Sequence, residues 1–255
     1  MHTRDMFSIA AQNGLPAVML IDDDMVSREV TATLLTMTGY DVHTAEDGER
    51  AIKMLAGAEC VPAVILMDAQ MPGLNGKDLI AELRSHSDAK IYAISGSALP
   101  REIAEAADGS LLKPFTMEAF SKIIEGQSAP AASSRISPDA PVLSSEILAQ
   151  FRTLMPEPKV RQIYSAVVAD LGNRIEALGA AIAKGDAAEV RRIGHAIKGG
   201  CGMAGAVQVA HLGAMLEASP MGPKDNQLDN SAALLRELRD AVRGLERMLD
   251  AELPA

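Results

Sequence analysis

The sequence lacks tryptophan, has only 3% aromatic residues and contains two cysteines among its 255 residues. Cys60 and Cys201 lie far apart without the spacing of metal ligands, which argues against a disulfide framework or a zinc site. We expect both to be buried thiols. A run of about 18 apolar residues and a secretory signal are also missing, so we expect a cytoplasmic protein without a membrane-spanning helix.

Positive charge is scarce as well: the chain has 24 lysine and arginine residues and 34 acidic residues, so its net charge is −10. This balance disfavours binding to nucleic acids and to anionic membranes, and we expect neither as a partner. The acidity is unevenly distributed, because residues 1–127 carry a charge of −9 and residues 128–255 a charge of −1.

The hydrophobic content of 48% is enough to build cores. At roughly 100–200 residues per domain, the length favours two domains. Residues 126–141 read GQSAPAASSRISPDAP, which is typical of a linker. We predict an N-terminal leader at residues 1–14, a first domain at 15–127, a linker at 128–141 and a second domain at 142–255.

The first half alternates short apolar runs with amphipathic segments. This alternation predicts an α/β fold with a doubly wound, five-stranded parallel sheet. Ligands of such sheets gather at the carboxyl ends of the strands. We expect strands at residues 17–21, 41–45, 63–67, 90–94 and 110–112.

The second half shows helical patterns without a convincing strand, which predicts an all-α four-helix bundle. Asp186 is the expected N-cap of the third helix. We expect helices at residues 144–154, 158–184, 187–217 and 229–252.

Polar side chains follow several predicted strands of the first half. Asp22, Asp23 and Asp24 come after the first strand, and Asp68 after the third. Clustered carboxylates repel one another unless a cation balances them, and Mg²⁺ prefers such oxygen ligands. Lys113 and Ser95, which close two further strands, add a positive charge and a hydroxyl to the same edge.

The segments Ile21-Asp22-Asp23-Asp24, Leu66 to Gly76 (LMDAQMPGLNG), Ile94-Ser95 and Lys113-Pro114 together resemble the motifs of a response-regulator receiver domain over about residues 15–127. The resemblance implies a flavodoxin-like fold. It implies that Asp68 is the phospho-acceptor and that Mg²⁺ binds Asp22, Asp23, Asp68 and the backbone carbonyl of Gln70. By the same similarity, Lys113 pairs with the phosphoryl oxygens and Ser95 responds to phosphorylation.

Two features depart from the receiver pattern. Ser110 stands where the family usually carries an aromatic switch residue, and the stretch from Ser95 to Lys113 is about one helical turn short. We therefore expect a truncated fourth helix and a receiver that acts mainly by passing on its phosphoryl group.

The second half contains a helical segment with a face of basic and small side chains. Arg191, His195, Lys198 and Gly199 share one face if the segment is helical. Each glycine in a helix interior costs roughly 0.8–1 kcal/mol of helix stability relative to alanine. A glycine-rich helical turn at this point therefore indicates that another group must come close to the helix.

The signature His195-Ala196-Ile197-Lys198-Gly199-Gly200 resembles that of a histidine-containing phosphotransfer (HPt) domain, over about residues 142–253. The similarity implies that His195 is a second phospho-acceptor, that Lys198 stabilises its phosphoryl group, and that Gly199 keeps the approach open.

The leading hypothesis is a phosphorelay signal-transduction protein that exchanges phosphoryl groups with a sensor or hybrid histidine kinase, or with another response-regulator receiver. No kinase ATP-binding region fits, so we expect a phosphotransfer protein and not an enzyme, apart from slow autophosphatase activity of the receiver. The alternative is a haloacid-dehalogenase-like phosphatase with Asp22 as the nucleophile. The direction of phosphoryl flow stays open.

Overall fold

A computed structural model describes residues 16–126, 141–218 and 225–253. The chain forms two compact units that divide between residues 132 and 133. The predicted leader and all but the last residue of the predicted linker lie outside the described residues. Each unit is considered by itself below.

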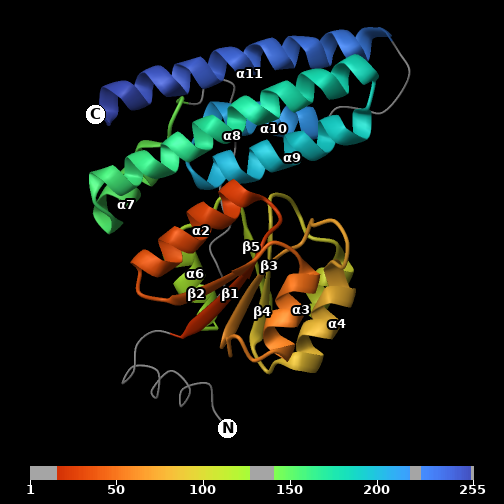
Figure 1. The fold of residues 1–255 in the computed structure, drawn as a ribbon, viewed down its shortest axis with the longest axis vertical. Coiled ribbons are helices and arrows are strands. Elements are labelled where there is room, and N and C mark those ends of the chain that lie inside the picture. Colours follow the sequence, from red (N-terminus) through yellow and green to blue (C-terminus); the bar gives the residue numbers. More distant parts are fainter. Residues whose placement is uncertain (1–15, 127–140, 219–224, 254–255) are drawn as a thin grey trace. The chain divides into compact units, whose positions relative to one another are not determined.

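The first unit is a parallel sheet flanked by helices, with the strand order β2-β1-β3-β4-β5 (Figure 1). The predicted doubly wound, five-stranded α/β fold is thus confirmed. The strands are β1 (Ala17–Ile21), β2 (Asp41–Ala45), β3 (Val64–Asp68), β4 (Lys90–Ser95) and β5 (Gly109–Leu112). The helices are α2 (Met25–Met37), α3 (Gly48–Ala56), α4 (Gly76–His86), α5 (Arg101–Ala106) and α6 (Met117–Ile124).

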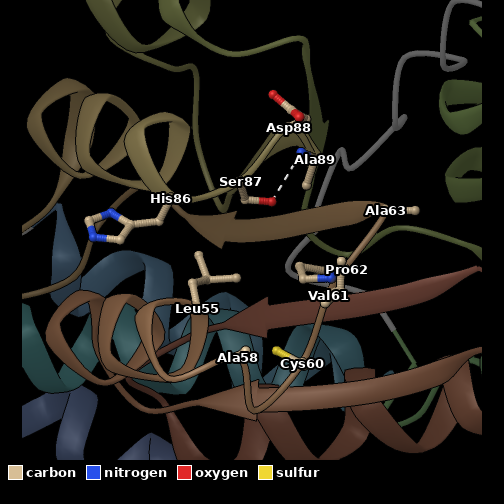
Figure 2. Close-up of a pocket in the computed structure, with 10 residues that line it drawn as sticks. All are labelled: Leu55, Ala58, Cys60, Val61, Pro62, Ala63, His86, Ser87, Asp88 and Ala89. Carbon is tan, nitrogen blue, oxygen red and sulfur yellow. Dashed lines mark hydrogen bonds between the residues drawn. The ribbon is translucent and has the colours of Figure 1, made fainter.

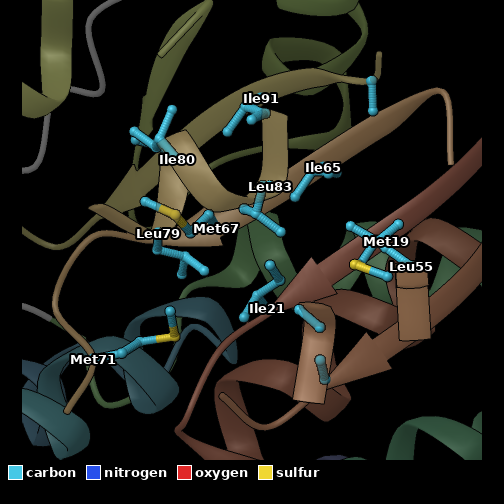
Figure 3. Close-up of a cluster of buried hydrophobic side chains, with 14 of the residues drawn as sticks. Met19, Ile21, Leu55, Ile65, Met67, Met71, Leu79, Ile80, Leu83 and Ile91 are labelled. Carbon is cyan, nitrogen blue, oxygen red and sulfur yellow. The ribbon is translucent and has the colours of Figure 1, made fainter. Parts of the chain in front are cut away.

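An apolar core lies on the face of the sheet that α3 and α4 cover. Met19, Ile21, Ile65 and Met67 alternate along β1 and β3, as a period of two requires, and their side chains are fully buried. Figure 3 shows them packed with Ile91 of β4 against side chains of α3 and α4. The helix residues labelled there are Leu55, Leu79, Ile80 and Leu83.

Strand register brings the polar strand ends together. Ile21 pairs with Met67, and Asp68 pairs with Ile94, so the residues that follow β1 lie beside the ends of β3 and β4. At the start of α2, the Asp24 carboxylate accepts a hydrogen bond from the Ser27 N–H over 2.7 Å and caps the helix. The chain therefore turns sharply after β1 and leaves Asp22 and Asp23 in the turn.

The expected truncation of the fourth helix of this unit is borne out by α5. It is six residues long and follows Pro100, which precedes its first turn. Ser110 lies on the edge strand β5 with its side chain exposed.

The second unit is helical, and four of its helices form the predicted bundle. Helix α8 packs against α9, α9 against α10, α10 against α11, and α11 against α8, which closes the ring. The described helices of this unit are α7 (Ser145–Leu154), α8 (Glu157–Lys184), α9 (Ala187–Met203), α10 (Val207–Glu217) and α11 (Asp225–Glu252). Within the described residues, no helix has both the length and the apolar character that a membrane crossing requires.

The prediction of one helix over residues 187–217 is wrong, because the chain turns between α9 and α10. Gly205 has a φ of +75°, in the left-handed region that favours glycine. A Cβ at Gly205 would lie 2.9 Å from the Cβ of Ile147, so α7 packs directly on this turn. The helix predicted at residues 144–154 is therefore an additional element, and the bundle consists of α8 to α11. Asp186 caps α9 as predicted, accepting a hydrogen bond from the Glu189 N–H.

Candidate functional site

Two buried carboxylates and one buried ammonium group form the centre of an acid pocket at the carboxyl ends of β1, β3 and β5. The Lys113 Nζ donates to Asp22 Oδ2 over 2.7 Å and to Asp68 Oδ2 over 2.6 Å. Side-chain exposure is 0% for Asp22, 5% for Asp68 and 4% for Lys113. The strand ends thus place all three predicted residues in contact, which their separation in the sequence did not show.

Neighbouring donors fix the orientation of both carboxylates. The Gln70 N–H donates to Asp68 Oδ1 over 2.8 Å, and the Asp24 N–H donates to Asp22 Oδ1 over 2.9 Å. The Ser27 hydroxyl donates to Asp22 Oδ2 over 2.7 Å. Sequence reasoning missed Ser27, because a serine in the first turn of a helix indicates little beyond helix initiation.

The charges of the pocket shift the pKa values of its members. Burial raises the pKa of Asp22, while the charge of Lys113 acts against this shift. Burial also raises the pKa of Asp23, and the negative charge of Asp68 adds to the effect. For Lys113, burial acts to lower the pKa, but the charges of Asp22 and Asp68 outweigh burial and raise it above its ordinary value. Lys113 is therefore a permanent cation in this pocket.

The donor set of the pocket fits a hard divalent cation. One carboxylate oxygen from each of Asp22, Asp23 and Asp68 lies within 4.8 Å of the others. Asp23 is exposed whereas Asp22 and Asp68 are buried, so the cluster opens to solvent on one side. An all-oxygen set with an open side suits Mg²⁺, which keeps several waters and binds substrate phosphate oxygens.

Ser95, the other predicted residue of this edge, ends β4 and is buried. Its hydroxyl accepts a hydrogen bond from the Ser97 N–H over 3.2 Å. Its carbonyl accepts one from the Lys113 N–H over 2.7 Å, which aligns the ends of β4 and β5. Ser95 and Lys113 are thus neighbours through their backbones.

A second cluster lies in the helical unit around His195. The His195 Nδ1 lies 2.8 Å from Glu217 Oε1, and the Lys198 Nζ donates to Glu217 Oε2 over 2.9 Å. His195 and Lys198 both belong to α9, whereas Glu217 is the last residue of α10. The hydrogen bond from His195, together with the hydrogen bond and charge of Lys198, lowers the pKa of Glu217 to about 2. Glu217 is thus an anion that fixes both predicted residues, and sequence reasoning missed it.

Two glycines allow the helix contact that brings Glu217 to His195. A Cβ at Gly194 would lie 2.6 Å from the Glu217 N and 2.8 Å from the Gly213 O. A Cβ at Gly213 would lie 2.7 Å from the Lys198 N. Backbone therefore meets backbone where α9 and α10 cross. Gly199 differs, because a Cβ there would meet no atom within 4 Å.

A hollow of about 430 Å³ lies elsewhere in the first unit. Figure 2 shows the residues that line it. Its lining includes Ala63 and Ala89, which directly precede β3 and β4, and the buried Cys60. It is therefore at the amino ends of these strands, whereas the acid pocket is at their carboxyl ends. Burial raises the pKa of the Cys60 thiol, so this thiol is a weak nucleophile.

The fold and the two clusters define a class of protein in which an acid pocket on a parallel sheet is joined in one chain to a histidine on a helical bundle. Comparison with known families agrees: residues 18–125 match the response regulator receiver domain and residues 162–248 match the Hpt domain. The chain therefore contains a response regulator receiver domain followed by an Hpt domain.

Two curated relatives illustrate the similarity. The sensor histidine kinase AruS of Pseudomonas aeruginosa is 28% identical over 90% of this chain and 24% of its own length. The probable transcriptional regulator ycf27 of Guillardia theta is 34% identical over 39% of this chain and 40% of its own length. The chain thus spans a quarter to under half of the length of these relatives.

Among solved structures, the Vibrio cholerae chemotaxis protein CheY4 is 28% identical, with a TM-score of 0.39. The match covers 44% of this chain and 97% of CheY4.

Proposed function

We propose that this chain is a phosphorelay protein that carries phosphoryl groups on Asp68 and on His195. The observation that supports the proposal is that one chain holds a buried aspartate paired with Lys113 and a histidine that shares the carboxylate of Glu217 with Lys198. Phosphoryl transfer needs a positioned nucleophile and compensation of the negative charge on the phosphoryl oxygens, and both centres supply these.

At the acid pocket, the proposed nucleophile is a carboxylate oxygen of Asp68. It attacks the phosphorus of a phosphorylated donor, the bond from phosphorus to the donor breaks, and the electron pair leaves with the donor. Gln70 N–H and Lys113 Nζ hold the two oxygens of Asp68 before the attack. Mg²⁺, when bound through Asp22, Asp23 and Asp68, would neutralise charge on the phosphoryl oxygens.

At the helical centre, Glu217 prepares His195 for transfer. An ionised carboxylate can only accept a hydrogen bond, so in the proposed arrangement Nδ1 carries the proton and donates it to Glu217. The lone pair is then on Nε2, which attacks phosphorus while the bond to the donor breaks. The positive charge that develops on the ring is stabilised by Glu217. Lys198 lies one helical turn away, and the open space beside Gly199 leaves room for an incoming receiver.

The partners we propose are a sensor or hybrid histidine kinase as donor and a second receiver as exchange partner. The relationship to AruS, a sensor histidine kinase, supports this choice. The buried thiols of Cys60 and Cys201 support a reducing, cytoplasmic compartment.

The haloacid-dehalogenase alternative gains no support from the fold or the comparisons. It requires Asp22 as the nucleophile. The match of residues 18–125 to the receiver domain accounts for the acid pocket without this assignment.

A single experiment tests the proposal. The full chain is treated with acetyl phosphate and Mg²⁺, and the phosphorylated residue is mapped by mass spectrometry in the wild type, Asp68→Asn and His195→Gln. His211→Gln serves as the matched control for the histidine. We expect label at Asp68, and label at His195 after addition of a phosphorylated receiver. Label on Asp22 that survives Asp68→Asn would refute the receiver chemistry, and a His195 that never gains label would refute the relay.

A further inference from the structure

Ser27 occupies an unusual place in the acid pocket. Its side chain is fully buried, and its hydroxyl lies 2.7 Å from Asp22 Oδ2 and 3.0 Å from Lys113 Nζ. A hydroxyl has one proton to donate and lone pairs to accept, so it donates to the carboxylate and accepts from the ammonium group. Asp22, Lys113 and Ser27 thus form a closed triangle of hydrogen bonds.

This triangle completes the bonding of Lys113. An ammonium group has three protons, and here they go to Asp22, Asp68 and Ser27. Of the three acceptors, Ser27 alone is neutral and is neither a proposed metal ligand nor the proposed phospho-acceptor. It therefore remains available to Lys113 when a cation or a phosphoryl group engages the two carboxylates.

Ser27 itself is held by the backbone. It lies in the first turn of α2, and its N–H donates to the Asp24 carboxylate that caps the helix. The start of α2 therefore fixes the backbone of Ser27, and from this position its hydroxyl reaches both Asp22 and Lys113.

We propose that Ser27 is a positioning residue for the divalent cation. Its hydroxyl holds the Asp22 carboxylate in the orientation that places an oxygen within 4.8 Å of those of Asp23 and Asp68, and it anchors Lys113 beside them. The inference rests on the part of the proposed function that assigns Mg²⁺ to this pocket. Groups that hydrogen-bond to a ligand typically change metal affinity by about 10–100-fold when they are removed.

The structure offers a matched control on the same helix face. Thr31 lies one turn after Ser27, is 1% exposed, and its hydroxyl has no partner among the described residues. Thr31→Val therefore removes a buried hydroxyl from α2 without removing a hydrogen bond. Ser27→Thr keeps the hydroxyl, whereas Ser27→Ala removes it and Ser27→Cys fills its space with a weak donor.

The test is a titration of the full chain with MgCl₂ alone, followed by the backbone amide NMR signals of Asp24 and Gln70, whose N–H groups donate to the pocket carboxylates. We expect Ser27→Ala and Ser27→Cys to weaken Mg²⁺ binding about tenfold. We expect Ser27→Thr and Thr31→Val to stay within about twofold of the wild type, because neither loses a hydrogen bond to the pocket. Thermal unfolding without Mg²⁺ identifies a variant that fails to fold. If Ser27→Ala does not fold, the test rests on Ser27→Cys, and the reverse holds if Ser27→Cys does not fold.

Unchanged Mg²⁺ affinity in a folded Ser27→Ala or Ser27→Cys variant would overturn the inference, and so would an equal loss in Thr31→Val. A wild type whose amide signals do not respond to Mg²⁺ would also overturn it. These outcomes are separate from the proposed function, which fails when Asp68 and His195 accept no label even though Mg²⁺ binds normally.

Discussion

The crossing of α9 and α10 offers a sharp test, because two glycines on one helix should respond to alanine in opposite ways. At Gly194 the added Cβ would lie 2.6 Å from the Glu217 N, 2.8 Å from the Gly213 O and 2.8 Å from the Leu216 Cβ. Two of these atoms are backbone, so α10 itself must shift. At Gly199 the Cβ would meet nothing within 4 Å.

The magnitudes follow from these distances. Overpacking costs about 1–3 kcal/mol, and backbone contacts place Gly194→Ala at the upper end. Alanine gains about 0.8–1 kcal/mol in a helix relative to glycine, so the net loss for Gly194→Ala is about 2 kcal/mol. Gly199→Ala meets no overpacking and therefore keeps the full gain of roughly 0.8–1 kcal/mol in helix stability. With a shift of roughly 4 °C per kcal/mol for a domain of this size, Gly194→Ala should melt about 8 °C below the wild type and Gly199→Ala about 3–4 °C above it.

The assay is thermal unfolding of the full chain, with amide hydrogen exchange of α9 and α10 to assign the transition to the second unit. Phosphotransfer is measured in parallel. Gly199→Ala should slow transfer to His195 although it stabilises the helix, because its methyl group occupies the space that an incoming receiver needs. A Gly194→Ala variant as stable as Gly199→Ala would refute the close helix contact, and an unchanged transfer rate in Gly199→Ala would refute the role of the open space.

Three further predictions concern charge and burial. Since the folded-state pKa of Glu217 is about 2 against an ordinary value of 4.5, its stabilisation is complete above about pH 4.5 and is lost as the pH falls toward 2. The difference in unfolding free energy between the wild type and Glu217→Gln, measured with urea, should therefore shrink as the pH is lowered, and a constant difference would contradict the pairing with His195 and Lys198. Lys113→Ala leaves Asp22 and Asp68 without their cation and should destabilise the first unit by about 3–5 kcal/mol. A thermal shift assay should show partial recovery when Mg²⁺ is added. A loss of stability under about 1 kcal/mol would show that the buried carboxylates and Lys113 are not charged. Cys60 and Cys201 are 7% and 3% exposed, so iodoacetamide should label them far more slowly in the native protein than in urea, as mass spectrometry can measure, and rapid native labelling would contradict their burial.

The strands and the acid pocket could be predicted from the sequence because the patterns that indicate them span only a few residues. Strands buried on both faces read as continuous apolar runs, as in Val64 to Met67, and the residue after such a run stands at the ligand-binding edge. Asp22, Asp68 and Lys113 could therefore be assigned to one edge before any contact was known. The boundaries shifted by a residue, since Asp68 belongs to β3 itself.

The turn between α9 and α10 was not accessible in this way. The apolar pattern of residues 187–217 continues through the turn, and several glycines precede Gly205, so no single glycine marks the break. The packing of Ile147 from α7 against Gly205 distinguishes this position from the others. A contact between distant segments thus decides where the helix ends.

The sequence by itself determined the order of the strands and helices of the first unit, the helical character of the second, and the two proposed acceptors, because each depends on patterns within a few residues. Only the tertiary structure decided which partners complete the sites. Ser27 is 86 residues from Lys113, and Glu217 is 22 residues from His195. Sheet order brings the first pair together, and the close crossing of two glycine-bearing helices brings the second. No local pattern encodes such distances, since they depend on how whole elements pack.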